Sequence, residues 1–452
     1  MQGPEVATVG RVDTRGGTFI LIGRNCVHQE SSMNNMTHCI IRNLGSIPMQ
    51  SRPFRTILYS LLSVAACCVA VANLTPGHGA EPAAKVREQK KTRLCVPPRC
   101  YAVAGEELRI YFDNVQSTPP IERSRILITK LDLRQGSGEV PSFGKRTERY
   151  WSLAPTTAEV GKHKLFVFAV ADDGTFDDVA QTELCVAPAD AGAGENLNLL
   201  IVGDSLTHAS LYPNQWSRLL SLPGNPKWTM LGTHKPANVA SGVAHEGYGG
   251  WRWETFETRY EPKPDRAKRI HSSPFVFVGK EGKPSLDVPR YFAESCEGRK
   301  PDVVTFLLGI NDCFGAPAND PAALDRHIDG VFVHADRVLA AFHAAAPEAD
   351  LAVCLTPPAN SRDEAFTINY QDKYPGSGWR KIQARLVERQ LAHFGGREAE
   401  RIFVVPTELD IDVTTGYPPN NAVHPNPEGY ARLAASLHAW LKWRMYETMP
   451  RK

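Results

Sequence analysis

Short runs of apolar residues recur along the second half of the chain, and each run ends near a small or polar residue. They cover residues 197–203, 228–232, 303–309, 351–356 and 402–406. Longer segments with helical spacing separate the runs, among them 321–346, 380–394 and 426–443. Apolar strands that alternate with helices are typical of a parallel sheet covered on both faces. The pattern therefore predicts an α/β domain, which we bound at residues 196–446.

Polar residues stand at or just after the ends of several of these predicted strands, namely Ser205, Asn311 and Thr356. The carboxyl ends of parallel strands share one edge of a sheet, and ligands bind beyond that edge. We therefore expect these residues to lie at one edge, where a functional site is predicted.

A different pattern precedes this domain, in residues 84–188. Apolar residues alternate with polar ones at Leu108, Ile110 and Phe112, and Ile126 and Ile128 repeat the alternation. Such alternation, broken by Gly, Pro and Asp turns, predicts short strands with one covered face. The region predicts a small β-sandwich of immunoglobulin-like type. Because it gathers no catalytic residue types, we expect it to act as a spacer or binding module.

Residues 189–195 are rich in Ala and Gly and predict a linker between the two domains. The glycines at 192 and 194 precede a strand instead of following one. That order excludes a dinucleotide-binding loop.

The N-terminal region carries a pattern typical of export. Arg52 and Arg55 precede a mostly apolar stretch, 57–72, which is too short for a comfortable transmembrane helix. Ala-Val-Ala at 70–72 fits a signal-peptidase site, and Ala80 offers a later one. The protein is therefore predicted to be secreted or periplasmic, with no stable membrane insertion after signal removal.

The position of this signal within the chain needs its own interpretation, because signal peptides stand at the extreme N-terminus. We interpret residues 49–80 as the signal peptide, Met49 as the true start and residues 1–48 as a misread extension. The alternative is an anchoring helix in a longer protein.

Charge and cysteine content narrow the possible partners. The chain has 51 basic and 49 acidic residues, for a net charge of +2, which gives no electrostatic reason to bind nucleic acid or an acidic membrane. No C-x-x-C pair occurs, so no zinc site is predicted. In an exported protein, Cys95 and Cys100 are candidates for a small disulfide loop, while Cys354 lies in an apolar run and is predicted to be a core residue.

The candidate chemistry is nucleophilic. The hydroxyl of Ser205 is a weak nucleophile until a base removes its proton, and His424 is a candidate base because imidazole titrates near neutrality. Attack on an ester builds negative charge on the carbonyl oxygen, and that charge needs preorganised N–H donors. Gly250 lets the backbone approach closely, and Asn311 offers a side-chain amide.

Four stretches carry these residues in order: GDSLTHAS with Ser205, HEGYGGWRWETF with Gly250, LLGINDCF with Asn311 and NNAVHPNPEGY with His424. They resemble the blocks of the SGNH (GDSL) hydrolase family, over most of residues 195–446. The resemblance implies that Ser205 is the nucleophile and His424 the base, and that Gly250, Asn311 and the Ser205 N–H form the oxyanion hole. It also implies a flavodoxin-like α/β/α fold with a five-stranded parallel sheet, and neither metal nor organic cofactor. Ser205 is not in a G-x-S-x-G elbow, which disfavours an α/β-hydrolase.

One position departs from the family pattern. The family places an aspartate three residues before the histidine, and here that position is Asn421. An amide oxygen accepts the imidazole N–H hydrogen bond, but it carries no charge to stabilise an imidazolium. The sequence leaves open whether Ser205 and His424 work as a dyad, or whether Asp410, Asp412 or a backbone carbonyl serves His424.

The second stretch bears on substrate. HEGYGGW resembles the HEGxxGW block of carbohydrate esterases in this family, which implies an acylated, in particular O-acetylated, carbohydrate substrate. Trp251 and Trp253 are candidates to stack on a sugar ring or, equally, to pack in the core. His245 is a candidate substrate contact or a simple turn residue.

The predicted function is therefore an exported serine esterase that works through an acyl-enzyme. Two alternatives stay open at this stage. One is a lipase, lysophospholipase or thioesterase built on the same framework. The other is a carbohydrate-binding or adhesion protein whose hydrolase domain has lost activity, with Asn421 as the trace.

Overall fold

The computed structural model describes residues 94–116, 125–135, 143–265 and 270–448. These residues belong to one compact unit, Lys90–Gly136 with Val140–Lys452. The second unit, Met1–Gln89 with Ser137–Glu139, lies outside the described residues. So do the predicted extension 1–48 and the predicted signal peptide 49–80.

The larger part of the described chain is built on a parallel sheet. Its strand order is β9-β8-β13-β14-β15, the doubly wound order in which the first strand lies between the second and the third. The strands are β8 (Asn196–Gly203), β9 (Lys227–Leu231), β13 (Val303–Leu307), β14 (Asp350–Cys354) and β15 (Ile402–Val405). Each coincides with one of the five predicted apolar runs, so the α/β prediction is confirmed.

The sheet has a sixth member that the predicted five-stranded sheet lacks. Strand β10 (Glu246–Gly247) pairs with Val202 and Gly203 at the end of β8, whereas β9 pairs with the beginning of the same strand. The chain thus returns to one edge of β8 twice. The second visit brings the HEGYGGW stretch to the carboxyl end of β8.

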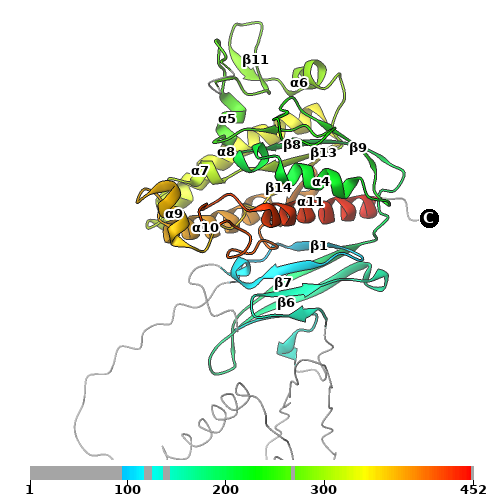
Figure 1. Ribbon diagram of the computed structural model, residues 1–452, viewed down its shortest axis with the longest axis vertical. Helices are drawn as coiled ribbons and strands as arrows, with labels where there is room; N and C mark the ends of the chain where they lie inside the picture. The colour runs from blue at the N-terminus through cyan, green and yellow to red at the C-terminus, as the bar shows by residue number, and fades with distance from the viewer. Residues whose placement is uncertain (1–93, 117–124, 136–142, 266–269, 449–452) are drawn as a thin grey trace, which may run out of the picture. The chain divides into compact units, whose positions relative to one another are not determined.

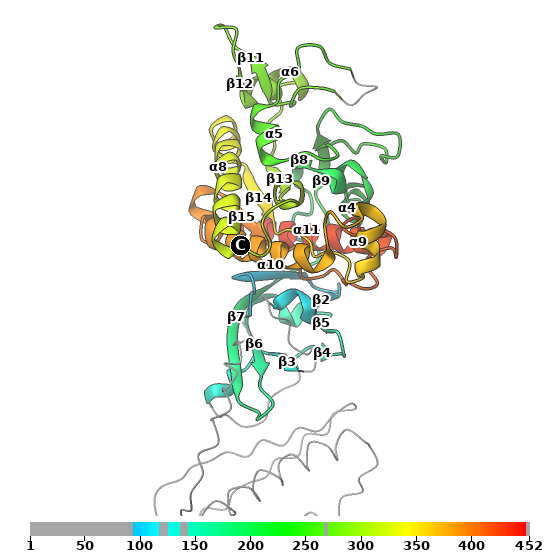
Figure 2. The same cartoon turned by 90° about the vertical axis from the view of Figure 1, so that its left-hand side faces the viewer.

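Helices cover both faces of this sheet (Figures 1 and 2). On one face Phe403 of β15 lies 6.2 Å from Trp440, ring centre to ring centre, and on the other Phe306 of β13 lies 5.4 Å from Phe342. Trp440 and Phe342 belong to the long helices α11 and α8. The helices are α3 (Ser205–His208), α4 (Leu211–Leu220), α5 (Trp253–Thr258), α6 (Val288–Ser295), α7 (Ile310–Cys313), α8 (Pro321–Ala345), α9 (Asp363–Tyr370), α10 (Gly376–Phe394) and α11 (Pro427–Thr448). A short hairpin, β11 (Val276–Val278) with β12 (Pro284–Leu286), extends beyond α5.

The smaller part of the unit consists of two sheets. One has the order β1-β7-β6-β3, with β1 parallel to β7, and the other has the order β2-β5-β4. The strands are β1 (Arg99–Val103), β2 (Leu108–Tyr111), β3 (Ile126–Thr129), β4 (Lys145–Arg146), β5 (Tyr150–Leu153), β6 (Gly161–Val170) and β7 (Phe176–Ala187). A 3-10 turn, η1 (Phe112–Val115), follows β2. We call residues 94–187 the β domain below.

The β domain has its own apolar core, centred on the fully buried rings of Trp151 and Phe112. Helix α11 packs on the α/β sheet and also contacts β1 and β7, so it lies between the two parts (Figure 1). One residue of the β-domain core comes from outside the domain. It is Leu409, from the loop that follows β15.

The cysteine prediction is wrong in one respect. Cys100 is a free thiol, so it forms no disulfide with Cys95 and the small loop is not closed. Cys100 is fully buried in the β-domain core, and Cys354 is a buried core residue of β14, as expected. No helix among the described residues is long and apolar enough to cross a membrane.

Candidate active site

Strand β8 delivers Ser205 to the edge of the sheet. The strand ends at Gly203, where a Cβ atom would lie 2.0 Å from the Thr207 hydroxyl, so a larger residue would displace the next turn. Asp204 caps the short helix α3 by accepting a hydrogen bond from Leu206 N–H at 2.9 Å. Ser205 is the first residue of that helix and is partly exposed. The end of the buried strand therefore leaves this hydroxyl at the edge of the sheet.

His424 reaches Ser205 from the opposite end of the chain. It stands in the loop 406–426, which joins β15 to α11. Its Nε2 atom lies 2.9 Å from Ser205 Oγ, although 219 positions separate the two residues. This is the distance at which a base takes a proton from a hydroxyl.

Asn421 occupies the third place behind His424. Its Oδ1 atom accepts backbone N–H bonds from His424 at 3.0 Å and from Val423 at 3.3 Å, and it lies 3.1 Å from His424 Nδ1. Because two backbone donors point at this atom, it is the carbonyl oxygen of the amide that faces the imidazole. Nδ1 therefore carries the hydrogen, and Nε2 is left to accept the Ser205 proton.

The two carboxylates that the sequence offered as alternatives serve other partners. Asp410 pairs with Arg432 of α11, and Asp412 pairs with Arg149 of the β domain. Within the part of the chain that the structure describes, Asn421 Oδ1 is the recorded partner of His424 Nδ1. The imidazole is thus oriented by a neutral amide.

Burial lowers the pKa of His424 from its ordinary value of 6.5. The cause is the loss of water around the charged imidazolium, and no anion of the residues that the structure describes opposes it. The neutral form, which can accept a proton, is therefore the resting form near neutral pH. The same environment gives the imidazolium that forms during catalysis no charge partner.

Gly250 and Asn311 lie on adjoining turns of the same edge. Gly250 is exposed, with φ of +80° in the turn from Tyr248 to Trp251, and apart from its two chain neighbours no described residue has an atom within 4 Å of where its Cβ would be. Asn311 Nδ2 donates to Trp251 O at 3.1 Å and to Asp204 Oδ2 at 3.3 Å. Asn311 thus connects the strand end that carries Ser205 with the turn that carries Gly250.

The three candidate substrate contacts are buried instead of open. Trp253 is 2% exposed and stacks on Phe306, so the packing alternative describes it and the stacking role on a sugar is not supported. Trp251 is 4% exposed, and its ring packs against Phe256 and neighbouring rings. His245 is fully buried, with Nε2 3.0 Å from Ser210 Oγ and Nδ1 accepting from Gly247 N–H. These contacts give His245 a structural role.

Thr356 follows the end of β14, as expected, but its side chain bonds away from the candidate site. Thr356 is buried and bonds to Gln390 of α10. Four residues later, the buried Asn360 holds the loop 406–426, which carries His424. Its side-chain amide donates to Pro418 O at 2.9 Å and to Asn421 O at 3.0 Å. The sequence shows that polar residues follow β14. Which of them reaches the site depends on how the loop after β14 folds, and the sequence does not reveal that.

Two buried acidic residues, Glu246 and Asp204, lie next to the candidate site residues in the chain. Glu246 is fully buried and accepts hydrogen bonds from Tyr248 OH, Tyr291 OH and Thr233 N–H, at 2.6, 2.7 and 2.6 Å. It fixes the stretch that leads to Gly250. Burial raises the pKa of Asp204 to about 7, and the nearby Asp312 adds to the rise.

The residues predicted to carry the chemistry thus converge from four separate stretches. In the described chain, no group of three or more His, Cys, Asp or Glu side chains is placed to hold a metal ion. A family model described as the GDSL-like Lipase/Acylhydrolase family matches residues 201–432, slightly more than half of the chain. The chain belongs to this family.

Gly203-Asp204-Ser205-Leu206 is the GDSL sequence of this member, and it lies at the start of the matched region. As a GDSL-like acylhydrolase, the protein is a carboxylic ester hydrolase. No curated protein matches the chain.

Matches to solved structures span about half of this chain. A carbohydrate esterase of family 3 from Talaromyces cellulolyticus is 17% identical, with a TM-score of 0.35 over 56% of this chain and all of that chain. A family 3 carbohydrate esterase from Clostridium thermocellum is also 17% identical, with a TM-score of 0.32 over 54% of this chain and 94% of that one. An acetyl xylan esterase is 13% identical, with a TM-score of 0.29 over 53% of this chain and 98% of that one.

Proposed function

We propose that this protein is an exported serine esterase that removes O-acyl groups, in particular O-acetyl groups, from carbohydrates through an acyl-enzyme. One observation carries the catalytic part of the proposal. Ser205 Oγ lies 2.9 Å from His424 Nε2, while His424 Nδ1 faces the carbonyl oxygen of Asn421. This arrangement provides a nucleophile, a base in the correct tautomer and a group that orients the base.

The reaction follows from these positions. Ser205 Oγ attacks the ester carbonyl while His424 Nε2 takes the hydroxyl proton. The tetrahedral intermediate collapses, the bond to the alcohol breaks, and His424 gives that proton to the leaving oxygen. A water molecule, deprotonated by His424, then attacks the acyl-serine and releases the carboxylic acid.

The developing oxyanion meets three donors in this proposal: the N–H groups of Ser205 and Gly250, and Nδ2 of Asn311. Asn311 has two amide hydrogens, which point at Trp251 O and, over the longer distance of 3.3 Å, at Asp204. The longer bond is the one that gives way when the oxyanion forms. Such a donor is worth about 3 kcal/mol of barrier.

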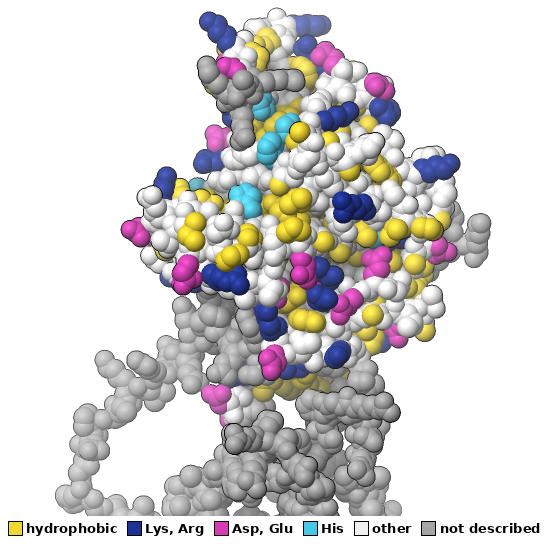
Figure 3. Space-filling view, in the orientation of Figure 1, with side chains coloured by type: hydrophobic (Ala, Val, Ile, Leu, Met, Phe, Trp, Pro, Cys, Tyr) yellow, Lys and Arg dark blue, Asp and Glu magenta, His cyan; other side chains and the backbone are white. Residues whose placement is uncertain are grey.

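The surroundings of Ser205 favour a polar alcohol. His208 ends the helix that Ser205 begins, and its Nδ1 lies 2.9 Å from Nε2 of His234, with the two rings stacked. The centre of the His234 ring lies 4.7 Å from the centre of the Tyr248 ring. Figure 3 shows several histidine side chains near one another on the face of the molecule that it presents. Imidazole groups offer hydrogen bonds to the hydroxyls of a sugar, which agrees with the HEGYGGW resemblance.

Two further assignments belong to this proposal. The pattern of residues 49–80 supports export to the periplasm or the exterior. The two packed sheets of the β domain support its assignment as an immunoglobulin-like module.

The test is a substrate screen on the full chain. Acetylated xylan, p-nitrophenyl acetate and esters of longer acyl chains are compared, with Ser205→Ala as the control. We expect acetate release from the polysaccharide and its loss in Ser205→Ala. We also expect a fluorophosphonate probe to modify Ser205.

The other outcomes select between the alternatives. A preference for long acyl chains would replace the carbohydrate assignment with a lipase or thioesterase one. Failure of the probe to label the folded protein would favour a carbohydrate-binding protein without activity.

A further inference from the structure

The loop 406–426, which carries Asn421 and His424, leaves the α/β domain before it returns to the site. After β15 ends at Val405, the chain runs along the β domain as far as Asp412. It then turns back past Ser361 and enters α11 at Pro427. The β domain therefore touches the segment that holds the proposed catalytic base.

Leu409 anchors the first part of this loop. Its side chain is 3% exposed and packs in the β-domain core with Ile110, Phe112 and other buried residues. Its carbonyl accepts a hydrogen bond from Tyr111 N–H, at the end of β2, at 3.0 Å. A residue of the catalytic loop thus completes the core of another domain.

Asn114 holds the loop backbone on either side of this anchor. The residue stands in the 3-10 turn η1, and its Nδ2 atom donates to Glu408 O at 2.7 Å and to Ile411 O at 2.8 Å. The two hydrogens of one amide thereby fix two carbonyl groups three residues apart. Neither carbonyl belongs to a helix or strand.

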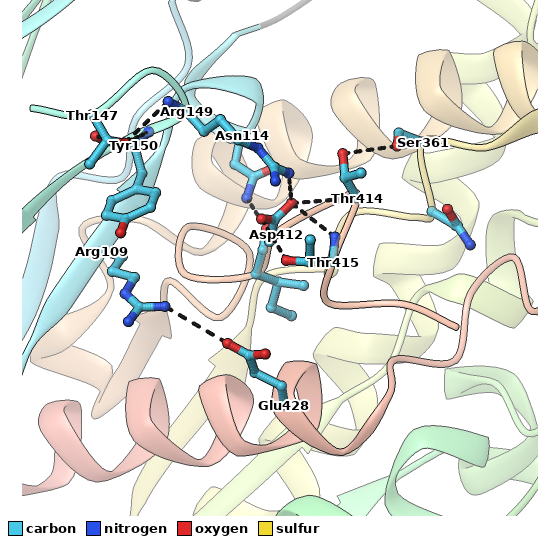
Figure 4. A network of polar contacts seen from close by, with 12 residues as sticks. Arg109, Asn114, Thr147, Arg149, Tyr150, Ser361, Asp412, Thr414, Thr415 and Glu428 are labelled. Atoms are coloured by element: carbon cyan, nitrogen blue, oxygen red, sulfur yellow. Dashed lines mark hydrogen bonds and ion pairs between the residues drawn. The ribbon is translucent and has the colours of Figure 1, made fainter. Parts of the chain in front are cut away.

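Arg149 adds a charged contact at the end of the same segment. Its guanidinium pairs with the Asp412 carboxylate, which is only 9% exposed (Figure 4). Asp412 also accepts from Thr414 N–H at 2.8 Å and from Thr415 Oγ1 at 2.8 Å. The arginine therefore holds the residue that shapes the turn back toward the site.

From this turn the contacts lead directly to the base. Asn426, two residues after His424, donates through Nδ2 to Thr415 O at 2.7 Å and through its backbone N–H to Gly416 O at 2.9 Å. The peptide that bears His424 is thus tied to the turn that Asp412 and Arg149 hold. Figure 4 shows Arg149, Asn114 and Asp412 at the start of this path.

We propose that the β domain is a positioning element for catalysis, in which Asn114 and Arg149 hold the loop that places His424 against Ser205. The proposal rests on the proposed function, because it gives these residues their effect through His424. Ser205, Gly250 and Asn311 stand on other elements, after β8, after β10 and in α7, and Asn311 bonds to Asp204 and Trp251 instead of to the described residues of the β domain. Loss of Asn114 or Arg149 is therefore expected to lower kcat and leave KM nearly unchanged.

The expected size follows from geometry. A displacement of about 1 Å at a reacting group costs up to about 10²-fold in rate. We expect Asn114→Ala and Arg149→Ala to lower kcat by about 10-fold or more within that limit. The rate at which a fluorophosphonate labels Ser205 should fall in parallel, and because it is a rate constant it does not depend on the amount of folded protein.

Matched controls remove similar contacts elsewhere. Asn225 donates through Nδ2 to the Leu219 and Leu222 carbonyls, at 3.1 Å each, after α4. Arg125 lies in the β domain, where it donates to Val170 O at 2.6 Å and faces the carboxylates of Asp172 and Asp177. Asn225→Ala and Arg125→Ala are expected to keep the wild-type kcat and labelling rate.

A double-variant cycle separates positioning from general damage. In His424→Ala, with free imidazole supplied as the base, there is no tethered base left to misplace. Asn114→Ala is therefore expected to change that residual rate by no more than about 2-fold, the range of additivity for independent sites. An equal loss with and without His424 would overturn the proposal, as would a wild-type labelling rate in folded Asn114→Ala.

A milder variant covers the case in which Asn114→Ala does not fold. Arg149→Lys keeps a positive charge beside Asp412 but loses the planar fork of the guanidinium. It should fall between wild type and Arg149→Ala in kcat, and a wild-type value for both Arg149 variants would overturn the proposal. If wild-type Ser205 is not labelled at all, the proposed function fails instead, so the two failures are distinguishable.

Discussion

The two halves of the loop 406–426 use polar side chains in different ways. The first half carries three acidic side chains, Glu408, Asp410 and Asp412, all buried. The second half places neutral groups around His424, with Asn421 at Nδ1 and Asn426 two residues on. One continuous loop thus keeps its charges at the domain junction and its base in uncharged surroundings.

The difference follows from what each half has to do. A buried carboxylate is costly without a partner, and Asp410 and Asp412 form ion pairs with Arg432 and Arg149. None of that charge is left for the imidazole. The comparison implies that changes at the catalytic half affect activity alone, whereas changes at the junction half affect both stability and activity.

The largest expected effect tests the first part of this statement. His424→Ala removes the base and should lower kcat by about 10⁴-fold or more. His424 is partly exposed, and within the described ranges its side chain bonds to Asn421 and Ser205, so the free energy of unfolding should change by less than about 1 kcal/mol. Steady-state kinetics and urea unfolding measure the two quantities. A large loss of stability would contradict the separation of the two halves.

The next effect is on stability. Leu409→Ala opens a cavity in the β-domain core and should cost about 2–5 kcal/mol of unfolding free energy. Because Leu409 also anchors the loop, kcat should fall in the protein that remains folded. Urea unfolding followed by circular dichroism measures the first effect.

The control for Leu409→Ala is Leu222→Ala. Leu222 is 54% exposed, so truncating it should stay within about 0.5 kcal/mol of wild type. An equally small effect at Leu409 would show that the junction is not part of the β-domain core.

The sequence predicted the framework of this arrangement but not the junction. Five strands follow from apolar runs, because a buried parallel strand leaves a continuous signal. The two-residue β10 leaves none, since Glu246 and Gly247 are too few to show a period. Leu409 reads as an ordinary loop leucine, because its partners lie about 300 positions away in the chain.

Some features of the candidate site could likewise be predicted from the sequence, and others could not. Motif order selects Ser205 and His424, whose side chains the fold brings within 2.9 Å. Alternation does not tell a covered ring from an open one, so the burial of Trp253 had to come from the structure. The contacts of Asn114 could not be predicted from the sequence either. Its side-chain amide bonds to backbone carbonyl groups, which every residue has, so no residue type marks its partners.

A third prediction restores charge to the catalytic half. Asn421→Asp places a carboxylate where Oδ1 now lies 3.1 Å from His424 Nδ1. The negative charge stabilises the imidazolium, so we expect kcat at pH 8 to rise about 10-fold, equivalent to about 1.4 kcal/mol. In the wild type, burial lowers the His424 pKa, so kcat/KM should fall only below pH 6.5. In Asn421→Asp, that fall should move to higher pH.

Asn420→Asp is the matched control, since it adds the same charge at an exposed neighbouring position. It should leave both kcat and the pH profile nearly as in wild type. If Asn421→Asp also left them unchanged, another charged group would already serve His424, and the contrast between the two halves would not hold.

The smallest effect concerns the carboxylate at the beginning of the loop. Burial raises the pKa of Glu408 to about 8, and in the described chain its Oε2 atom has no hydrogen-bond partner. The folded state therefore holds a proton that the unfolded chain releases above its ordinary value of 4.5. The contribution of this group to the free energy of unfolding is fully present below pH 4.5 and is lost as the pH rises through about 8. One group contributes a slope of at most about 1.4 kcal/mol per pH unit.

Glu408→Gln keeps the neutral form at every pH, so its unfolding free energy should fall less between pH 5 and pH 8 than that of the wild type. Asp410 and Asp204 have raised pKa values of about 7 and contribute in the same direction, so the slope is reduced and not abolished. Glu281→Gln, at an exposed position, should retain the wild-type slope. Equal slopes in Glu408→Gln and wild type would mean that Glu408 is ionised when folded. The first half of the loop would then carry a third buried charge that still needs a partner.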